Sequence, residues 1–242
     1  MSLKDRRIVL IGASSGIGLA CAQAARAAGA RLVIAGRNTE RLELARRALG
    51  GAVEAFRLDA MESQSVAAFF RRVGAHDHLS IFVPTVPNAR VRARLGQFAD
   101  TPSDAFAAVF ASKFGANLNC LRYGAPHVRD SIVLVTGQAH RKSLPGYAAG
   151  AAANGALEAL VRTLALELAP VRINVVAPGI VETPILRDMP AEMFEAFEAK
   201  TRKQPVARLG SVAEIAGAVL KLMENGYATG AVLEIDGGYK LT

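Results

Sequence analysis

The feature that most constrains the fold of this chain is an alternation of short apolar runs with longer helical patterns. The short runs are rich in β-branched residues and mostly apolar on both faces, as in a parallel sheet that helices cover on each side. Seven strands are expected, at residues 8–11, 32–35, 53–58, 79–83, 132–136, 173–176 and 232–235. Helices are expected between them, at residues 16–28, 39–49, 63–73, 102–128, 147–168 and 212–223.

Helix start signals agree with this alternation. Ser211 and Glu214 have the spacing of a capping box, and Thr101 stands before Pro102 as a capping residue before a first helical proline. Strand–helix–strand units with right-handed crossovers predict a Rossmann-like, doubly wound α/β fold, with a seven-stranded parallel sheet and helices on both faces.

The domain organisation follows from the absence of repeats, low-complexity tracts and linkers in the sequence. Residues 1–242 are expected to form a single dinucleotide-binding domain. Residues 178–205 are the longest irregular stretch, with a small helix expected at 192–200. An insertion after a late strand is expected to cover the ligand crevice on the substrate side.

Composition argues against several other classes of protein. Hydrophobic residues make up 51% and charged residues 21%, which does not suit a disordered chain. No apolar run approaches the ~18 uncharged residues of a membrane span, and residues 8–11 are too short for the apolar core of a signal peptide. Two cysteines exclude a disulfide scaffold, and no Cys/His spacing suggests a metal. The expected setting is therefore reducing and cytoplasmic.

The net charge of +8 raises the question of a nucleic-acid partner. Aromatic residues make up only 6% of the chain and do not interleave with the basic ones, so no nucleic-acid partner is expected.

A glycine-rich turn joins the first strand to the first helix. Glycines at this place let the backbone approach a pyrophosphate, and the helix start offers free N–H groups and the positive end of the helix dipole. Because strand, turn and helix follow in the required order, nucleotide binding is favoured over a simple tight turn. The expected binding residues are Gly12, Ser14, Ser15, Gly16, Ile17 and Gly18.

The end of the second strand indicates which dinucleotide is bound. An NAD site carries a carboxylate there for the ribose hydroxyls, whereas this chain has Arg37 followed by Asn38. A guanidinium matches the oxygens of a 2′-phosphate, so NADP(H) is the expected cofactor, although Arg37 could also be a solvated residue before a helix. Asp59 and Ala60, after the third strand, are candidates for holding the adenine, with a helix cap as the alternative for Asp59.

Taken together, these motifs resemble the short-chain dehydrogenase/reductase family over nearly the whole chain. Three further stretches carry the resemblance: residues 174–179 with Thr183, residues 157–174, and residues 227–238. The resemblance implies that Pro178, Gly179, Ile180 and Thr183 hold the nicotinamide carboxamide. It also implies a homodimer or homotetramer assembled through two long helices and the C-terminal segment.

The family's catalytic Ser, Tyr and Lys do not match this sequence. The stretch from Asn154 resembles the one that begins at the family lysine, so the tyrosine position falls on Gly150 and the serine position on Gly137. Asn154 could still hydrogen-bond a ribose hydroxyl of the cofactor. Two supporting motifs also differ: Ile11 stands for a threonine, and residues 83–86 stand for an Asn-Asn-Ala-Gly stretch.

Several side chains are candidates to replace the missing groups. The family asparagine on the helix after the fourth strand falls on Ser112 or Lys113. Our hypothesis is that Lys113 places its ammonium near the vacant lysine position, and the alternative is that it reaches the surface. Thr136 and Tyr147 could supply a hydroxyl, although Tyr147 could equally be a packing residue.

The loops after the fourth and fifth strands are basic and leave the ligand-binding edge of the sheet. They favour an anionic small-molecule substrate, with ordinary surface charge as the alternative. A lone loop histidine is expected to be solvated. The residues concerned are Arg90, Arg92, Arg94, Gln138, His140, Arg141 and Lys142.

The sequence thus predicts an NADP(H)-dependent oxidoreductase that moves a hydride between nicotinamide and a carbonyl or alcohol, with a non-standard catalytic site. The alternative is a protein of this family that binds NADP(H) as a sensor or subunit with little catalysis.

Overall fold

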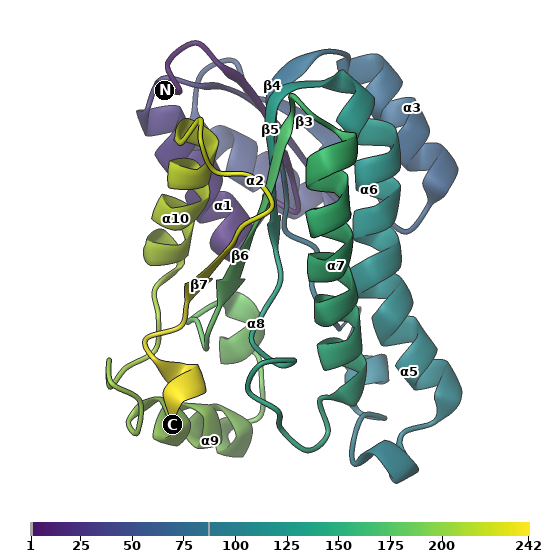
Figure 1. The fold of residues 1–242 in the computed structure, drawn as a ribbon, viewed down its shortest axis with the longest axis vertical. Helices are drawn as coiled ribbons and strands as arrows, with labels where there is room; N and C mark the ends of the chain where they lie inside the picture. Colours follow the sequence, from purple (N-terminus) through teal and green to yellow (C-terminus); the bar gives the residue numbers. More distant parts are fainter. Residues whose placement is uncertain (1, 87) are drawn as a thin grey trace.

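A seven-stranded parallel sheet runs through the middle of the molecule, in the order β3-β2-β1-β4-β5-β6-β7 (Figure 1). The structure is a computed structural model and describes residues 2–86 and 88–242. The strands are β1 Arg7–Ile11, β2 Arg31–Gly36, β3 Glu54–Arg57, β4 His76–Ile81, β5 Val128–Val135, β6 Arg172–Pro178 and β7 Val232–Ile235. The expected seven-stranded, doubly wound sheet is confirmed.

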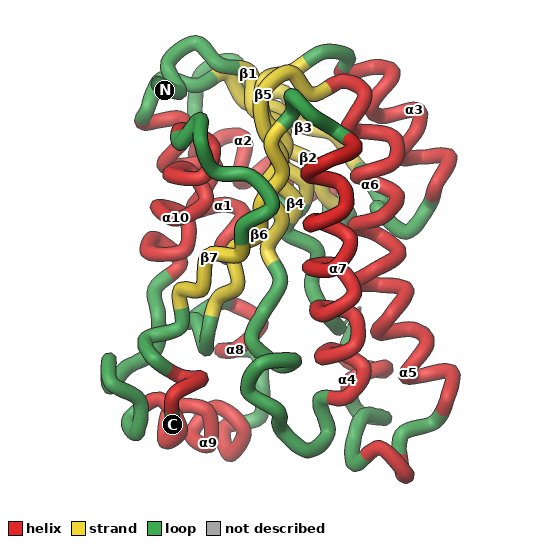
Figure 2. Tube along the Cα trace, in the orientation of Figure 1, coloured by secondary structure: helices red, strands yellow, loops and turns green. Residues whose placement is uncertain are grey.

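Helices form a layer on each face of the sheet (Figure 2). The helices α1 Gly16–Ala27, α2 Thr39–Leu49 and α10 Val212–Glu224 pack on one face. The helices α3 Ser63–Val73, α5 Ser103–Phe110, α6 Ala116–Gly124 and α7 Ala148–Glu167 lie on the other. This layering explains why the strands are apolar at consecutive positions, since both faces are buried.

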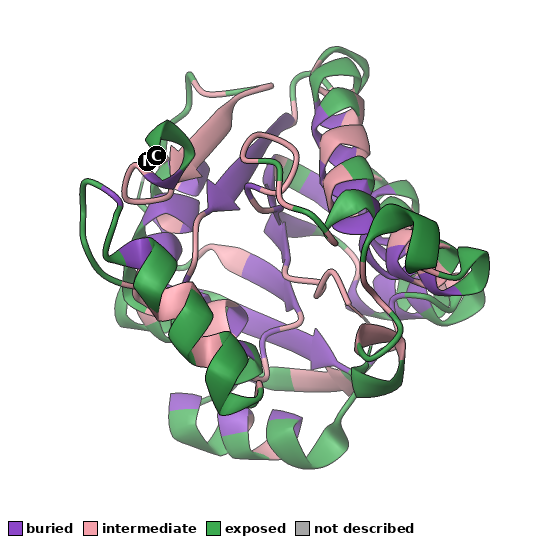
Figure 3. Ribbon diagram, turned by 90° about the horizontal axis from the view of Figure 1, so that it is seen from below, coloured by how far each residue is buried: buried purple, intermediate pink, exposed green. Residues whose placement is uncertain are grey.

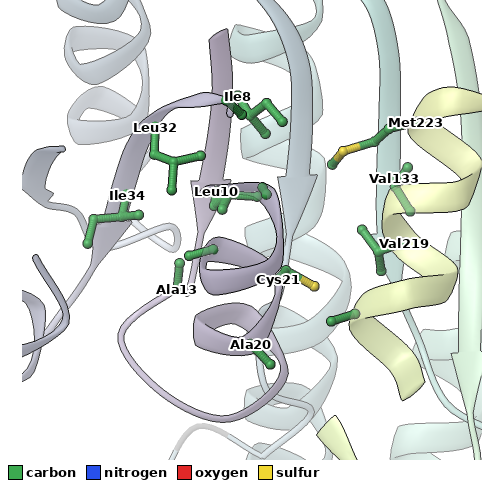
Figure 4. Close-up of a cluster of buried hydrophobic side chains, with 14 of the residues drawn as sticks. Ile8, Leu10, Ala13, Ala20, Cys21, Leu32, Ile34, Val133, Val219 and Met223 are labelled. Atoms are coloured by element: carbon green, nitrogen blue, oxygen red, sulfur yellow. The ribbon is translucent and has the colours of Figure 1, made fainter. Parts of the chain in front are cut away.

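Strand β1 shows how the alternation of side chains divides the core. Ile8 and Leu10 belong to the cluster with α1 and α10, while Val9 and Ile11 belong to the cluster on the opposite face. All four side chains are fully buried. Figure 4 shows Leu10 between Ile8 and Cys21 of α1, all three in the same cluster.

The carboxyl ends of the strands meet at one edge of the sheet, which Figure 3 shows from below. The loops that follow β1, β4, β5 and β6 all leave from this edge. The edge is therefore the place where residues far apart in sequence can build one site.

The long helix expected at 102–128 is interrupted. A π-helical turn, η2 Ala111–Gly115, separates α5 from α6, and a 3-10 turn, η3 Ala125–His127, follows α6. The start also differs, because Pro102 is the capping residue and not the first helical one. The Thr101 hydroxyl donates instead to the carbonyls of Gly96 and Gln97.

Strand β4 begins at His76, not at residue 79 as expected. The prediction was wrong because His76 and His78 are polar yet buried, each 1% exposed. His76 Nδ1 hydrogen-bonds the Gly74 carbonyl and His78 Nδ1 the Ser131 hydroxyl. Burial lowers the pKa of His76 to about 4, so it is neutral near pH 7.

Short helices complete the carboxyl edge. The segment after β6 contains α8 Pro184–Arg187 and α9 Ala191–Thr201, and the latter confirms the small helix expected at 192–200. Sequence reasoning missed α8, as well as α4 Ala89–Arg92, η1 Phe98–Asp100 and η4 Tyr239–Leu241. Within the part of the chain that the structure describes, no helix is long and apolar enough to cross a membrane.

Candidate functional site: a glycine-lined nucleotide edge

The turn after β1 brings backbone so close to backbone that side chains are excluded. Gly12 has φ +85°, and a Cβ there would lie 2.5 Å from the carbonyl oxygen of Phe82. A Cβ on Gly18 would overlap the Gly12 carbonyl oxygen and lie 2.9 Å from Ala13 Cα. These contacts require glycine at both positions.

The start of α1 is open to an anion. Gly16 is its first residue, with φ +54°, and Ser15 before it makes no side-chain capping bond to the helix. The first N–H groups of α1, at the positive end of the helix dipole, are therefore available to an anion. Ile17 and Gly18 lie within this first turn. These features fit a dinucleotide pyrophosphate, as the sequence predicted.

The phosphate turn faces the loop after β6. A Cβ on Gly16 would lie 3.8 Å from the side chain of Thr183 and 3.7 Å from Pro184. The Thr183 hydroxyl accepts from the N–H of Leu186 and so caps α8. The structure thus brings together two motifs that are far apart in the sequence.

Contacts with Asp236 and Gly210 hold the loop after β6 in place. Pro178 is the last residue of β6, and a Cβ on Gly179 would lie 2.8 Å from Asp236 Cα. After Ile180, Val181 pairs in a parallel bridge with Gly210. The backbone that the family resemblance assigns to the carboxamide is therefore held rigidly at the carboxyl edge.

The end of β2 places Arg37 and Asn38 beside the same edge. Arg37 is exposed, and the Asn38 side chain accepts from the N–H of Arg41 and caps α2. The Ser14 hydroxyl lies 3.5 Å from where a Gly36 Cβ would stand, so the phosphate turn adjoins the end of β2.

The end of β3 places Asp59 and Ala60 near the same edge. Asp59 Oδ1 accepts from the N–H of Met61, while the capping residue of α3 is Glu62. The alternative of Asp59 as the helix cap is thus wrong. The Ala60 carbonyl accepts from the side chain of Asn119.

The positions expected to lack catalytic side chains lie in the loop just after β5 and on α7. Among the residues that the structure describes, a Cβ on Gly137 would meet only Asn154 Nδ2, at 3.4 Å, and one on Gly150 only Thr85 Cγ2, at 3.1 Å. Neither glycine has a positive φ. Asn154 is buried, and its Oδ1 has no hydrogen-bond partner within residues 2–86 and 88–242.

Lys113 is buried within the π-helical turn, with 3% of its surface exposed. The alternative that it reaches the surface is therefore wrong. Its Nζ donates to the carbonyl oxygens of Val83, at 2.9 Å, and Val135, at 2.7 Å. Burial lowers the pKa of Lys113 to about 8.

Ser112 and Lys113 also fix the loop that departs from the family pattern. The Ser112 hydroxyl donates to the carbonyl of Pro84, next to the Val83 carbonyl that binds Lys113. Ile11, the second departure, is a buried core residue at the end of β1. The helix therefore supplies the polar contacts that hold the loop after β4.

Sequence reasoning missed a buried carboxylate on α7. Glu158 is 3% exposed and accepts from the hydroxyl of Thr136, at 3.0 Å, from Arg141 Nη1, at 2.9 Å, and from Arg141 Nη2. His140 Nε2 lies 3.1 Å from Glu158 Oε2, so the expectation of a solvated His140 is wrong. A carboxylate one helical turn after Asn154, on an otherwise apolar stretch, was the available signal.

The basic residues of the edge are only partly available for a ligand. Arg94 forms two hydrogen bonds of 2.7 Å with Asp104, and Arg141 is held by Glu158. Gln138 donates to the carbonyl of Ala177. The three lie in the loops after β4 and β5, for whose charges the sequence leaves two interpretations, an anionic substrate and ordinary surface charge.

Tyr147 and Lys142, both before the first residue of α7, lie near Tyr239 of the C-terminal turn η4. Tyr147 is the residue that caps α7, and its side chain is 37% exposed. Burial raises its pKa, and the nearby Tyr239 adds to that shift while Arg92 opposes it. Lys142 Nζ lies 5.5 Å from the centre of the Tyr239 ring.

Comparison with known proteins agrees with the fold. A family profile described as enoyl-(acyl carrier protein) reductase matches residues 12–240. The 3-oxoacyl-(acyl-carrier-protein) reductase of Mus musculus is 33% identical, over 98% of this chain and 99% of that protein.

Solved structures give the same result. A short chain dehydrogenase/reductase family protein superposes with a TM-score of 0.85 at 29% identity, over 100% of both chains. A small-chain dehydrogenase in complex with NADPH does so with a TM-score of 0.79 at 28% identity, over 99% of this chain and 100% of that one.

The fold and the phosphate turn define a Rossmann-like protein. The family profile matches residues 12–240 and therefore identifies a narrower group than Rossmann-like proteins in general. The chain belongs to the short-chain dehydrogenase/reductase family.

Proposed function

We propose that this protein is an NADP(H)-dependent oxidoreductase that moves a hydride between nicotinamide and a carbonyl or alcohol. The observation that carries the proposal is the turn in which Gly12 and Gly18 exclude any side chain in front of the uncapped start of α1. That arrangement suits a pyrophosphate, and the adjoining Thr183 suits the nicotinamide end of the same molecule.

Each part of the cofactor has residues of this chain to hold it. In the proposal, Arg37 contacts the 2′-phosphate, Asp59 and Ala60 face the adenine, and Asn154 binds a ribose hydroxyl. Residues 178–183 bind the carboxamide, and residues 178–205 cover the substrate. The bound cofactor supplies the hydride, while the protein orients the substrate and excludes water.

The catalytic site is non-standard in this proposal. Gly137, Gly150 and Asn154 take the positions at which the family carries Ser, Tyr and Lys, so no phenol stands at the tyrosine position. Thr136 donates to Glu158, which makes it a less suitable proton donor than the sequence suggested. A small-molecule substrate remains the proposal, and an anionic one would depend on Arg92 and Lys142 more than on Arg94 or Arg141.

The second candidate is a protein that binds NADP(H) with little catalysis, acting as a sensor or subunit. The glycines at positions 137 and 150, which bring no acid or base, favour this candidate. For either function we propose a homodimer or homotetramer. Leu118 of α6 and Leu166 of α7 support it, because both are apolar and exposed on the long helices.

Titration of the purified protein with NADPH and with NADH, followed by nicotinamide fluorescence, tests the proposal. Tighter binding of NADPH is expected. Binding of neither cofactor would refute both candidates, and NADPH binding without turnover of any carbonyl would leave the second. Light scattering of the same sample measures the oligomeric state.

A further inference from the structure

Lys113 brings a cation into the interior of the carboxyl edge, where none of the described carboxylates pairs with it. Its ammonium has three N–H groups, and the carbonyls of Val83 and Val135 accept two of them. Burial alone lowers its pKa, with no charged neighbour contributing to the shift. An ammonium in such a place is a poised proton donor with one N–H group to spare.

Asn154 lacks a hydrogen-bond donor among the described residues, whereas Lys113 lacks a third acceptor. Its Oδ1 is buried without a partner, and a buried acceptor left in this state is costly. Its Nδ2 lies 3.4 Å from where a Gly137 Cβ would stand, two residues beyond the Val135 carbonyl that binds Lys113. Helix α7 packs against the π-helical turn, so the two side chains converge on the same end of β5.

One water molecule would satisfy both groups. It would accept a hydrogen bond from Lys113 Nζ, donate one to Asn154 Oδ1, and keep its second O–H for a ligand. The small residues Gly137 and Gly150 leave that side of the end of β5 without a competing side chain. A π-helical turn at Lys113 fits such a role, since these turns are frequent at functional sites.

We propose that Lys113 is the proton source for carbonyl reduction and that Asn154 is the positioning residue for the water that carries the proton. This inference rests on the function proposed above. It names the group that replaces the missing phenol of this site.

Reduction of the carbonyl needs one hydride and one proton. As the hydride of the cofactor adds to the carbonyl carbon, the π-electron pair of the C=O bond moves to the oxygen. That oxygen takes a proton from the water, and the water takes one from the Lys113 ammonium. Lys113 is left as a neutral amine, which recovers a proton from solvent; alcohol oxidation runs through the same steps in reverse.

Among the described residues, no charged group contributes to the shift in the pKa of Lys113. On α7 the next turn carries Glu158, which Arg141 and His140 hold, and the contacts from β5 and from the loop after β4 are backbone carbonyls. The acid form of Lys113 is lost as pH rises through about 8. We therefore expect kcat/KM for reduction to fall above that pH.

The first experiment measures the ionisation of Lys113 directly, without turnover. NMR of protein with 13C at the lysine Cε carbons should show one resonance that titrates near pH 8 and is absent from Lys113→Met. In Asn154→Asp that resonance should titrate at higher pH, because a carboxylate beside the ammonium favours its charged form. A Lys113 resonance that titrates near 10.5, or that Asn154→Asp leaves unmoved, overturns the proposal.

The second experiment follows NADPH oxidation with small ketones and aldehydes between pH 6 and 10. Lys113→Met should lose about 10²- to 10⁴-fold in kcat/KM and lose the fall above pH 8, whereas Asn154→Asp should move that fall upward. Lys221→Met, an exposed lysine on α10, is the matched control and should behave as the wild type. NADPH affinity and melting temperature report whether each variant is folded.

The outcomes separate the two proposals. Absence of NADPH binding by the wild type refutes the proposed function, while the NMR titration still judges the ionisation of Lys113. If NADPH binds but the wild type reduces no carbonyl, or if Lys113→Met keeps its rate and pH profile, Lys113 is not the proton source.

Discussion

The phosphate turn and the end of β5 both carry glycines at the carboxyl edge of the sheet, but for different reasons. At Gly12 and Gly18 a Cβ would collide with backbone atoms of the same turn or of Phe82, the residue after β4. At Gly137 and at Gly150 a Cβ would meet one side-chain atom of the described part of the chain, at 3.4 Å and 3.1 Å respectively. Glycine is thus a steric requirement on the proposed cofactor side, whereas on the proposed catalytic side we interpret it as the absence of a side chain.

The two regions are also stabilised differently. Close backbone contacts hold the phosphate turn, and a buried set of polar side chains around Glu158 holds the loop after β5. The first arrangement tolerates no added atom, while the second depends on retaining one carboxylate. Substitutions in each region should therefore fail by different physical mechanisms.

Gly18→Ala should have the largest effect. The added methyl would overlap the Gly12 carbonyl oxygen, and neither partner is a flexible side chain that could move. We expect a loss of about 3 kcal/mol in the free energy of unfolding, the upper end of the usual cost of overpacking, together with loss of NADPH binding. Urea denaturation and NADPH titration measure the two; a variant as stable as the wild type would disprove the steric requirement.

Glu158→Gln should have the next largest effect, on the catalytic side. It leaves Arg141 without its buried carboxylate, which costs roughly 3–5 kcal/mol for a fully buried pair. Because the Arg141 side chain is 22% exposed and a glutamine keeps some hydrogen bonds, about 2 kcal/mol is expected here. Glu167→Gln, on the exposed end of α7, is the control. If NADPH affinity falls as far as in Gly18→Ala, the two regions are not separable.

Arg37→Ala tests the adenosine end of the cofactor side. Loss of a charge-assisted contact to the 2′-phosphate removes about 1.4–2.8 kcal/mol, which is roughly 10- to 100-fold in NADPH affinity. NADH affinity should stay unchanged, because NADH has no 2′-phosphate. Arg41→Ala, an exposed arginine on α2, is the matched control. Equal losses of NADPH and NADH affinity would mean that Arg37 stabilises the turn and does not recognise the 2′-phosphate.

The strands and the phosphate turn could be predicted because their signals are local. Residues 8–11 are apolar at every position, residues 173–176 are apolar except for Asn174, and the glycines of the turn stand at fixed spacing. His76 and His78 hid the start of β4, because their partners are a carbonyl and a hydroxyl that only the folded chain supplies. The contacts of Lys113 and Glu158 join residues 17 to 30 positions apart, beyond any local pattern.

Gly150→Ala should have the smallest effect, and of opposite sign to Gly18→Ala. Gly150 lies inside α7 without a positive φ, where alanine is about 1 kcal/mol more favourable than glycine. The methyl at 3.1 Å from Thr85 Cγ2 offsets part of that gain. In a Thr85→Ser background this methyl contact is gone, so the full gain should appear. If Gly150→Ala destabilises in both backgrounds, glycine is required at this position too, and the contrast between the two regions fails.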